Sequence, residues 1–170
     1  MRNALAPTAV LLLLAACSRS SEPTPVAAPP EQPPSPASVV HAADPKTAAQ
    51  LLQGWHGVEQ GSWRWTQKRF SVALKPPGGG QPATLQLKFS LPDVLIQRLQ
   101  SITLSATVNG APLPPQTYQQ AGAQVYAQSV PSATLVGEAV RVDFTLDKAL
   151  APSDADHREL GVVVSSVSLE

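Results

Sequence analysis

The chain has 170 residues, and its 12 basic and 12 acidic side chains balance to a formal net charge of zero. This balance argues against nucleic acid or an anionic surface as the partner. Cys17 is the single cysteine, which excludes an internal disulfide and any metal site built from several thiolates.

The N-terminal residues 1–16 have the organisation of a secretory signal. Arg2 supplies a positive charge, a leucine-rich apolar run follows over residues 9–14, and two alanines close the segment. The apolar run is too short to span a bilayer, which takes about 20 apolar residues. We therefore expect residues 1–16 to be a signal peptide that is removed.

The segment Leu14-Ala15-Ala16-Cys17 resembles the lipobox of bacterial lipoprotein precursors. The resemblance implies a diacylglyceryl group on the Cys17 thiol, cleavage before Cys17, and acylation of the new amine with a fatty acid such as palmitate. Because each buried methylene contributes about 0.8 kcal/mol, several acyl chains hold a small domain firmly. Ser18 is not acidic, which is typical of outer-membrane lipoproteins. We expect a lipid-anchored envelope protein at the outer membrane. The sequence leaves open whether its domain faces the periplasm or the outside of the cell. An ordinary cleaved signal with an incidental cysteine is the alternative.

Residues 17–46 have the composition of a tether. Proline fixes φ and removes a backbone donor, and the segment offers too little apolar surface for a core. Such segments favour extended polyproline II, at about 3.1 Å per residue. We expect a disordered spacer, with a proline-motif ligand as the alternative. The prolines include Pro23, Pro25, Pro29, Pro30, Pro33, Pro34 and Pro36.

From residue 47 onwards, alternation of apolar and polar residues predicts half-buried strands. Residues 47–52 suggest a helical turn, and residues 91–99 predict one or two turns of helix. Asn109-Gly110 suits a type I′ hairpin turn, and the prolines at 112, 114 and 115 predict a short return strand. The other strand candidates are residues 63–67, 70–74, 85–89, 102–108, 125–130, 140–146 and 161–169.

This pattern predicts an all-β domain over residues 47–170. Seven or eight strands with turn signals between them and almost no helix indicate an antiparallel β-sandwich. We favour a jelly-roll-like topology over an immunoglobulin-like one.

Two stretches carry a second resemblance. One is Gly54-Trp55-His56-Gly57-Val58-Glu59 followed by Trp63-Arg64-Trp65-Thr66, and the other runs from Asp154 to Val164, with Val108-Asn109-Gly110 between them. Together they resemble a β-sandwich module often appended to bacterial glycosyltransferases and surface-glycan proteins. The resemblance covers residues 54–170 and implies a jelly-roll accessory domain near carbohydrate, without established chemistry. Here the module follows a lipid anchor, which puts in doubt a role beside a catalytic domain of the same chain.

The candidate ligand site is a cluster of aromatic and charged residues. Tryptophan faces stack on sugar rings, while arginine and carboxylate groups bind hydroxyls. Trp63 and Trp65 lie two apart on one strand, so both can instead fill the core. Trp55 is off that strand and is the better candidate for an exposed platform. The predicted ligand-binding residues are Trp55, Glu59, Arg64, Asp156 and Arg158.

The same charged residues suggest a contact between distant segments. Because sandwiches commonly bring their first and last strands together, we expect the Glu59 and Arg64 region to meet Arg158-Glu159. Asp154, Asp156 and Glu159 offer oxygens to Ca²⁺, but their spacing is far from that of an EF-hand. We favour turn-capping aspartates and a fixed ion pair, with no metal and no cofactor.

Catalytic motifs are not evident. His41, His56 and His157 fall in the tether or in loops, and the sequence has no nucleophile elbow, phosphate loop or metal-ligand pair. We expect a non-enzymatic, membrane-anchored lipoprotein whose sandwich binds surface carbohydrate. The alternative is a structural or assembly lipoprotein that docks an envelope protein. An exposed Trp55 in a polar groove would favour the first, and an apolar patch or unpaired edge strand the second.

Overall fold

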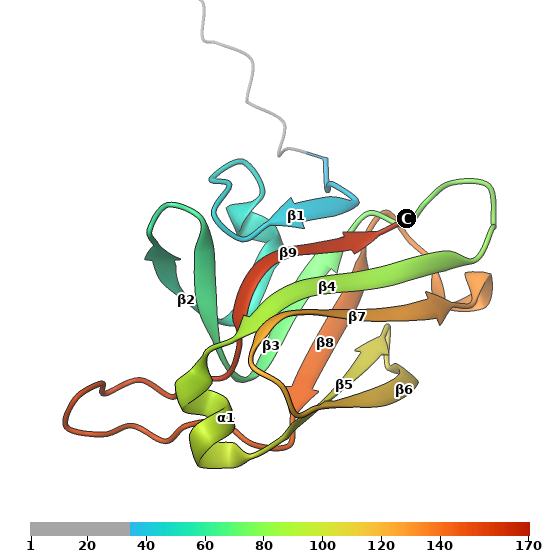
Figure 1. Cartoon of the computed structure of the whole chain (residues 1–170). Helices are drawn as coiled ribbons and strands as arrows, with labels where there is room; N and C mark the ends of the chain where they lie inside the picture. Colours follow the sequence, from blue (N-terminus) through green and yellow to red (C-terminus); the bar gives the residue numbers. More distant parts are fainter. Residues whose placement is uncertain (1–34) are drawn as a thin grey trace, which may run out of the picture. The chain divides into compact units, whose positions relative to one another are not determined.

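Nine strands, all paired antiparallel, make up most of residues 35–170, the part of the chain that the computed structural model describes (Figure 1). The predicted signal peptide, Cys17 and most of the tether lie outside the described residues. The strands are β1 (Val39–His41), β2 (Leu51–Glu59), β3 (Trp63–Leu74), β4 (Ala83–Leu91), β5 (Ile102–Val108), β6 (Ala111–Tyr118), β7 (Gly122–Val130), β8 (Val140–Leu146) and β9 (Val163–Leu169).

Helical structure is limited to short segments. The α-helix α1 (Asp93–Leu99) lies in the segment predicted as helical, and the 3-10 turn η1 (Ala48–Gln50) confirms the predicted turn before β2. A second 3-10 turn, η2 (Ser132–Thr134), follows β7. No helix formed by residues 35–170 has the length and hydropathy that crossing a membrane requires.

The nine strands form one continuous sheet that folds into two layers around a common core. One layer has the order β6-β5-β8-β3, with β2 added at β3, and the other has the order β9-β4-β7, with β1 added at β9. The layers join where the first part of β3 pairs with β9. Rings meet across the core, with centroids 5.0 Å apart for Phe89 and Tyr118 and 6.4 Å apart for Tyr126 and Phe144. The predicted antiparallel sandwich is confirmed, with nine strands instead of seven or eight.

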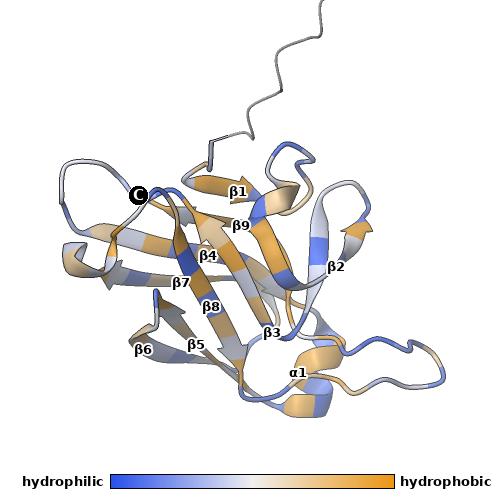
Figure 2. Cartoon of the chain, turned by 180° about the vertical axis from the view of Figure 1, so that it is seen from behind, coloured by the Kyte–Doolittle hydropathy of each residue, from blue (hydrophilic) through white to orange (hydrophobic). Residues whose placement is uncertain are grey.

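The alternation in the sequence accounts for most of the core. Strands β4, β5 and β8 each bury every second residue, and Figure 2 shows hydrophobic and hydrophilic bands alternating along β8. Phe70 of β3 stacks on Phe144 of β8 with ring centroids 4.9 Å apart. These strands confirm the predicted periodicity, and their inward side chains supply a large share of the buried hydrophobic residues.

The folded unit begins earlier than residue 47, the predicted start of the domain. Val40 in β1 is fully buried, and β1 pairs with β9. The Gln50 side chain also binds the residues before β1. Its Oε1 accepts the Ala37 N–H at 2.9 Å and its Nε2 donates to the Ala37 carbonyl at 3.0 Å, as a backbone amide in a paired strand would. The boundary therefore moves to about residue 35. A three-residue strand is too short for alternation to reveal.

The β5–β6 hairpin forms as Asn109-Gly110 predicted, with φ of 48° and 84° at its two turn residues. The prediction of a short return strand is wrong, because β6 pairs with β5 from Ala111 to Tyr118 despite its three prolines. β6 lies at one end of the sheet, where prolines are tolerated because one edge needs no ladder.

Tyrosine hydroxyls bridge the two ends of the sheet. The Tyr118 hydroxyl donates to the Val125 carbonyl at 3.0 Å, and the Tyr126 hydroxyl donates to the Pro114 carbonyl at 2.9 Å. Burial raises the pKa of Tyr126 to about 12 and raises that of Tyr118 as well. These two hydrogen bonds hold β6 against β7, which are not paired by a backbone ladder.

Candidate functional site

Arg158 holds the segment before β9 against the end of β2. Its Nη1 donates to Glu59 Oε1 at 2.7 Å, while its Nε and Nη2 donate to the two carboxylate oxygens of Asp156 at 3.0 and 2.9 Å. The Arg158 backbone N–H also donates to Asp156 Oδ1 at 3.0 Å. These bonds lower the pKa of Asp156 to about 2 and raise that of Arg158. The predicted meeting of the two regions, the ion pair and the turn-capping aspartate are confirmed.

The residues after Arg158 are fixed to β3. The Lys68 backbone N–H donates to Glu159 Oε1 at 2.7 Å, and the Gly161 N–H donates to the Thr66 carbonyl at 2.7 Å. A Cβ at Gly161 would lie 2.7 Å from the Gln67 carbonyl oxygen. Only glycine permits this approach, which explains the glycine at this position of the stretch from Asp154 to Val164.

Arg64 also has a structural role. Its Nε donates to the Ala42 carbonyl at 2.6 Å and its Nη1 to the His56 carbonyl at 2.8 Å. The His56 Nε2 in turn lies 2.7 Å from the Glu159 carbonyl. The Arg64 guanidinium thus joins the end of β1, β2 and β3 through two hydrogen bonds to protein carbonyls.

Trp55 is half-buried and does not form the exposed platform expected from the sequence. Its Nε1 donates to the Ser71 carbonyl at 2.8 Å, and its ring meets the edge of Phe70 with centroids 5.2 Å apart. Trp55 packs against the core at a point where the register between β2 and β3 shifts, since Gln53 pairs with Ser71 and Trp55 with Thr66.

Trp63 and Trp65 are both half-buried and meet edge to face, with centroids 6.4 Å apart. Trp65 packs against the core, so the core interpretation holds for it in part. The fully buried residue at this point of β3 is Thr66, whose hydroxyl accepts the Val162 N–H at 3.1 Å.

The five predicted ligand residues therefore form a scaffold. Glu59, Asp156 and Arg158 satisfy one another, while Arg64 and Trp55 bind backbone carbonyls. Among residues 35–170, no group of three or more His, Cys, Asp or Glu side chains is arranged to hold a metal ion.

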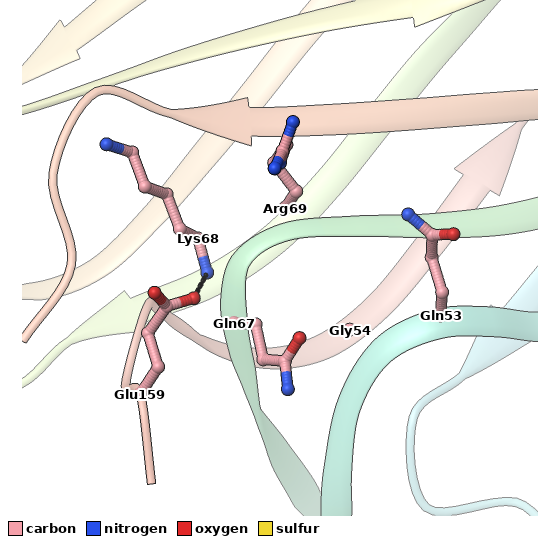
Figure 3. Close-up of a pocket in the computed structure, with 6 residues that line it drawn as sticks. All are labelled: Gln53, Gly54, Gln67, Lys68, Arg69 and Glu159. Carbon is pink, nitrogen blue, oxygen red and sulfur yellow. Dashed lines mark hydrogen bonds between the residues drawn. The ribbon is translucent and has the colours of Figure 1, made fainter. Parts of the chain in front are cut away.

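An open cavity of about 470 Å³ lies beside this scaffold; we call it the β2–β3 pocket (Figure 3). It forms where β3 changes partner, since β3 pairs with β9 as far as Trp65 and with β8 from Arg69 onwards. The change leaves three consecutive exposed residues, which breaks the alternation of the strand. The pocket is lined by Gln53, Gly54, Gln67, Lys68, Arg69 and Glu159.

Gly54 permits the close approach of β2 that shapes one wall. Its φ is +75°, and a Cβ there would overlap the Arg69 carbonyl and lie 2.7 Å from Phe70 Cα. Side chains at this position would therefore push β2 away from β3. Gln53 and Trp55, on either side of Gly54, have different surroundings: Gln53 is exposed at the pocket and Trp55 packs against the core.

The pocket residues were missed by the sequence prediction. Gln67, Lys68 and Arg69 are ordinary polar residues, and the sequence signal that marks them is the run of four polar residues from Thr66 to Arg69 within an alternating strand. Glu159 was predicted as a charge partner and weighed as a Ca²⁺ ligand, and the structure places it in the lining of the pocket, where its Oε1 accepts the Lys68 N–H.

A second, more open cavity of about 330 Å³ lies where β6 meets β7. Its lining is rich in amides and contains no charged side chain. The residues are Gln116, Thr117, Tyr118, Gln119, Gln120, Gln124 and Val125.

The comparisons with known proteins bear on the fold. No family model and no curated protein matches the chain. Among solved structures, a family GH115 4-O-methyl-alpha-glucuronidase with specificity for decorated arabinogalactans is similar at a TM-score of 0.50 and 10% identity, over 85% of this chain and 19% of that one. The sugar-binding EclA C-terminal domain is similar at a TM-score of 0.42 and 12% identity, over 59% of this chain and 64% of that one.

A further similar structure is the CBM36-1 domain of a multidomain xylanase from a termite hindgut metagenome. It has a TM-score of 0.43 and 8% identity, over 78% of this chain and 94% of that one. The chain spans less than two thirds of both the glucuronidase and the EclA domain. At these identities the likeness is one of fold, and the glucuronidase shows that this fold forms part of a larger solved protein.

Proposed function

We propose that the protein is a lipid-anchored envelope protein without enzymatic activity whose β-sandwich binds carbohydrate in the β2–β3 pocket. The observation that carries the proposal is the pocket itself. Its volume of about 470 Å³ falls in the range of small-ligand sites, and amides, cations and a carboxylate line it. Glutamine amides offer both donors and acceptors, as sugar hydroxyls do, so each hydroxyl can find a matching partner.

The fold gives this proposal indirect support. The similar glucuronidase acts on a polysaccharide, and the similar region is about a fifth of that enzyme. The similar region is thus part of an enzyme that acts on carbohydrate. The sequence resemblance noted above also implies a domain near carbohydrate.

A non-enzymatic role fits the composition of the pocket. Glycoside hydrolysis normally uses two carboxyl groups that flank the scissile bond. The β2–β3 pocket is lined by one carboxylate, that of Glu159, and one of its oxygens accepts the Lys68 N–H. Binding without cleavage is the chemistry that these groups supply.

The lipid anchor is the second part of the proposal. Cys17 in the lipobox-like segment is the attachment residue, and Ser18 favours the outer membrane. Metabolic labelling with an acyl precursor tests this part, since label should enter the wild-type chain and be absent from the Cys17→Ser variant. Label retained in Cys17→Ser would refute the anchor.

A glycan array probed with the full-length protein in detergent tests the binding function. We expect one class of glycan to bind, and we expect Gln67→Ala and Gln53→Ala to weaken that binding by about tenfold each, because each removes one or two hydrogen bonds. Gln97→Ala is the matched control, since Gln97 is an exposed glutamine on α1. No glycan bound, or binding indifferent to both pocket variants, would contradict the proposal.

One observation favours a second function, the docking of an envelope protein. Within the described residues, β2 pairs only with β3, and its Leu52 and Val58 side chains are 45% and 41% exposed. An unpaired edge with exposed apolar residues is a common docking surface. A photo-crosslinking residue in place of Val58 should then capture one defined partner in intact cells, whereas the same residue in place of Lys88 should not.

A further inference from the structure

The β2–β3 pocket carries two cations that the protein does not neutralise. The ion pairs formed within residues 35–170 join Arg158 to Glu59 and Asp156, and Arg141 to Asp143. The Lys68 and Arg69 side chains, which are exposed and line the pocket, take part in none of them. In a chain with balanced charge, two adjacent free cations in one cavity are a specific feature.

The positive and negative groups of the pocket lie at different places. In Figure 3, the Lys68 side chain extends away from the Glu159 carboxylate, and the Arg69 guanidinium also lies apart from that carboxylate. The Glu159 Oε1 accepts the Lys68 backbone N–H at 2.7 Å, which fixes the negative group at the base of Lys68 and not at its ammonium end. An anionic ligand group would therefore be attracted to the Lys68 and Arg69 end and repelled from the Glu159 end.

The arginines of the scaffold lie outside this pocket. Arg158 is paired with Glu59 and Asp156, Arg64 donates to backbone carbonyls, and neither of them lines the β2–β3 pocket. Recognition of an anion at this pocket therefore falls to Lys68 and Arg69.

We infer that the β2–β3 pocket selects an acidic saccharide, a sugar that carries a carboxylate, with Lys68 and Arg69 binding the carboxylate and Gln53 and Gln67 binding hydroxyls. This inference rests on the proposed carbohydrate-binding function and specifies its ligand class. Arginine binds a carboxylate through two parallel hydrogen bonds, and lysine adds a point charge. A neutral sugar would leave both cations without a partner.

The experiment compares two forms of one ligand. The full-length protein in detergent is titrated with an oligosaccharide of uronic acids and with the same oligosaccharide after its carboxyl groups have been reduced to alcohols. We expect the reduced form to bind at least about tenfold more weakly, because it loses the charge-assisted hydrogen bonds. Raising the ionic strength should weaken only the acidic form, since salt screens exposed charges.

Variants assign the effect to the two cations. Lys68→Gln and Arg69→Gln should each weaken binding of the acidic form by about tenfold and bring its affinity close to that of the reduced form. Lys88→Gln is the matched control, because Lys88 is an exposed lysine on β4 and lies outside the pocket. Both cations are exposed, so their replacement should leave the fold intact, which the thermal transition verifies.

The outcomes separate the two claims. Equal binding of both forms, weakened by Gln67→Ala but not by Lys68→Gln, would overturn the selectivity for acidic sugars and leave carbohydrate binding in place. Binding of neither form, together with a blank glycan array, would overturn both.

Discussion

The guanidinium of Arg158 and the carboxylate of Glu59 lie 2.7 Å apart, although 99 residues separate them in the chain. This contact fastens the segment before β9 to the end of β2, and the β2–β3 pocket forms beside it. The side chains are 38% and 34% exposed, so solvent screens the pair and its contribution to stability is modest.

A double-mutant cycle of Arg158→Gln and Glu59→Gln measures that contribution. We expect a coupling free energy of about 0.5–1 kcal/mol from urea unfolding, as is typical of partly exposed pairs. A cycle of Lys88→Gln and Glu59→Gln, which pairs Glu59 with a lysine from a different strand, should give a coupling near zero. Equal coupling in both cycles would show that the contact does not hold the two segments together.

The low pKa of Asp156 predicts how stability depends on pH. In the folded protein this pKa is about 2, below its ordinary value of 3.8, because Arg158 donates hydrogen bonds to the carboxylate. A depressed carboxyl pKa contributes stability that is fully present above the unfolded value and is lost as pH falls through the folded value. The free energy of unfolding should therefore decrease between about pH 4 and pH 2. In Asp156→Asn this part of the decrease should vanish, and an unchanged pH profile in the variant would contradict the assignment.

Gly54→Ala tests the close approach of β2 to β3. The φ of +75° and the overlap of a Cβ with the Arg69 carbonyl predict a loss of about 3 kcal/mol in unfolding free energy. Gly57→Ala, on the same strand, should change it by less than about 0.5 kcal/mol, because a Cβ there meets no atom within 4 Å. Similar losses in the two variants would mean that β2 does not lie as close to β3 as described.

Gln50→Ala tests the attachment of β1. The Gln50 side chain makes hydrogen bonds to the Ala37 N–H and to the Ala37 and Ala73 carbonyls, so its removal should cost about 1–2 kcal/mol. Amide exchange in Val39–His41 should accelerate while exchange in β4 stays slow. Gln53→Ala, an exposed glutamine nearby, is the control, and accelerated exchange throughout the domain would indicate general destabilisation instead.

The strands could be predicted wherever one face of the sheet is buried. Alternation in residues 85–89, 102–108 and 140–146 follows directly from a buried inner face and a polar outer face, and the structure reproduces it. β1 escaped prediction because three residues carry no period, and β2 because its bulges interrupt the alternation.

The sequence prediction found the residues that surround the candidate site but missed those that line its cavity. Glu59, Asp156 and Arg158 stand out in the sequence because charged residues near tryptophans suggest a ligand, yet they serve mainly to bind one another. Lys68 and Arg69 face the pocket because β3 changes partners between Trp65 and Arg69, and such a change depends on distant strands. In the sequence, this change of partner shows only as a run of four consecutive polar residues, Thr66 to Arg69.

Chemical-shift mapping by NMR of the isotope-labelled full-length protein tests the central claim, carbohydrate binding in the β2–β3 pocket, most directly. The protein is titrated with the uronic acid oligosaccharide and with its carboxyl-reduced form. We predict that the acidic form shifts the amide resonances of Gln53, Gln67, Lys68, Arg69 and Glu159, while those of Gln116 to Val125 at the second cavity stay in place. Shifts confined to β6 and β7, or no shift with either ligand, would contradict carbohydrate binding in the β2–β3 pocket.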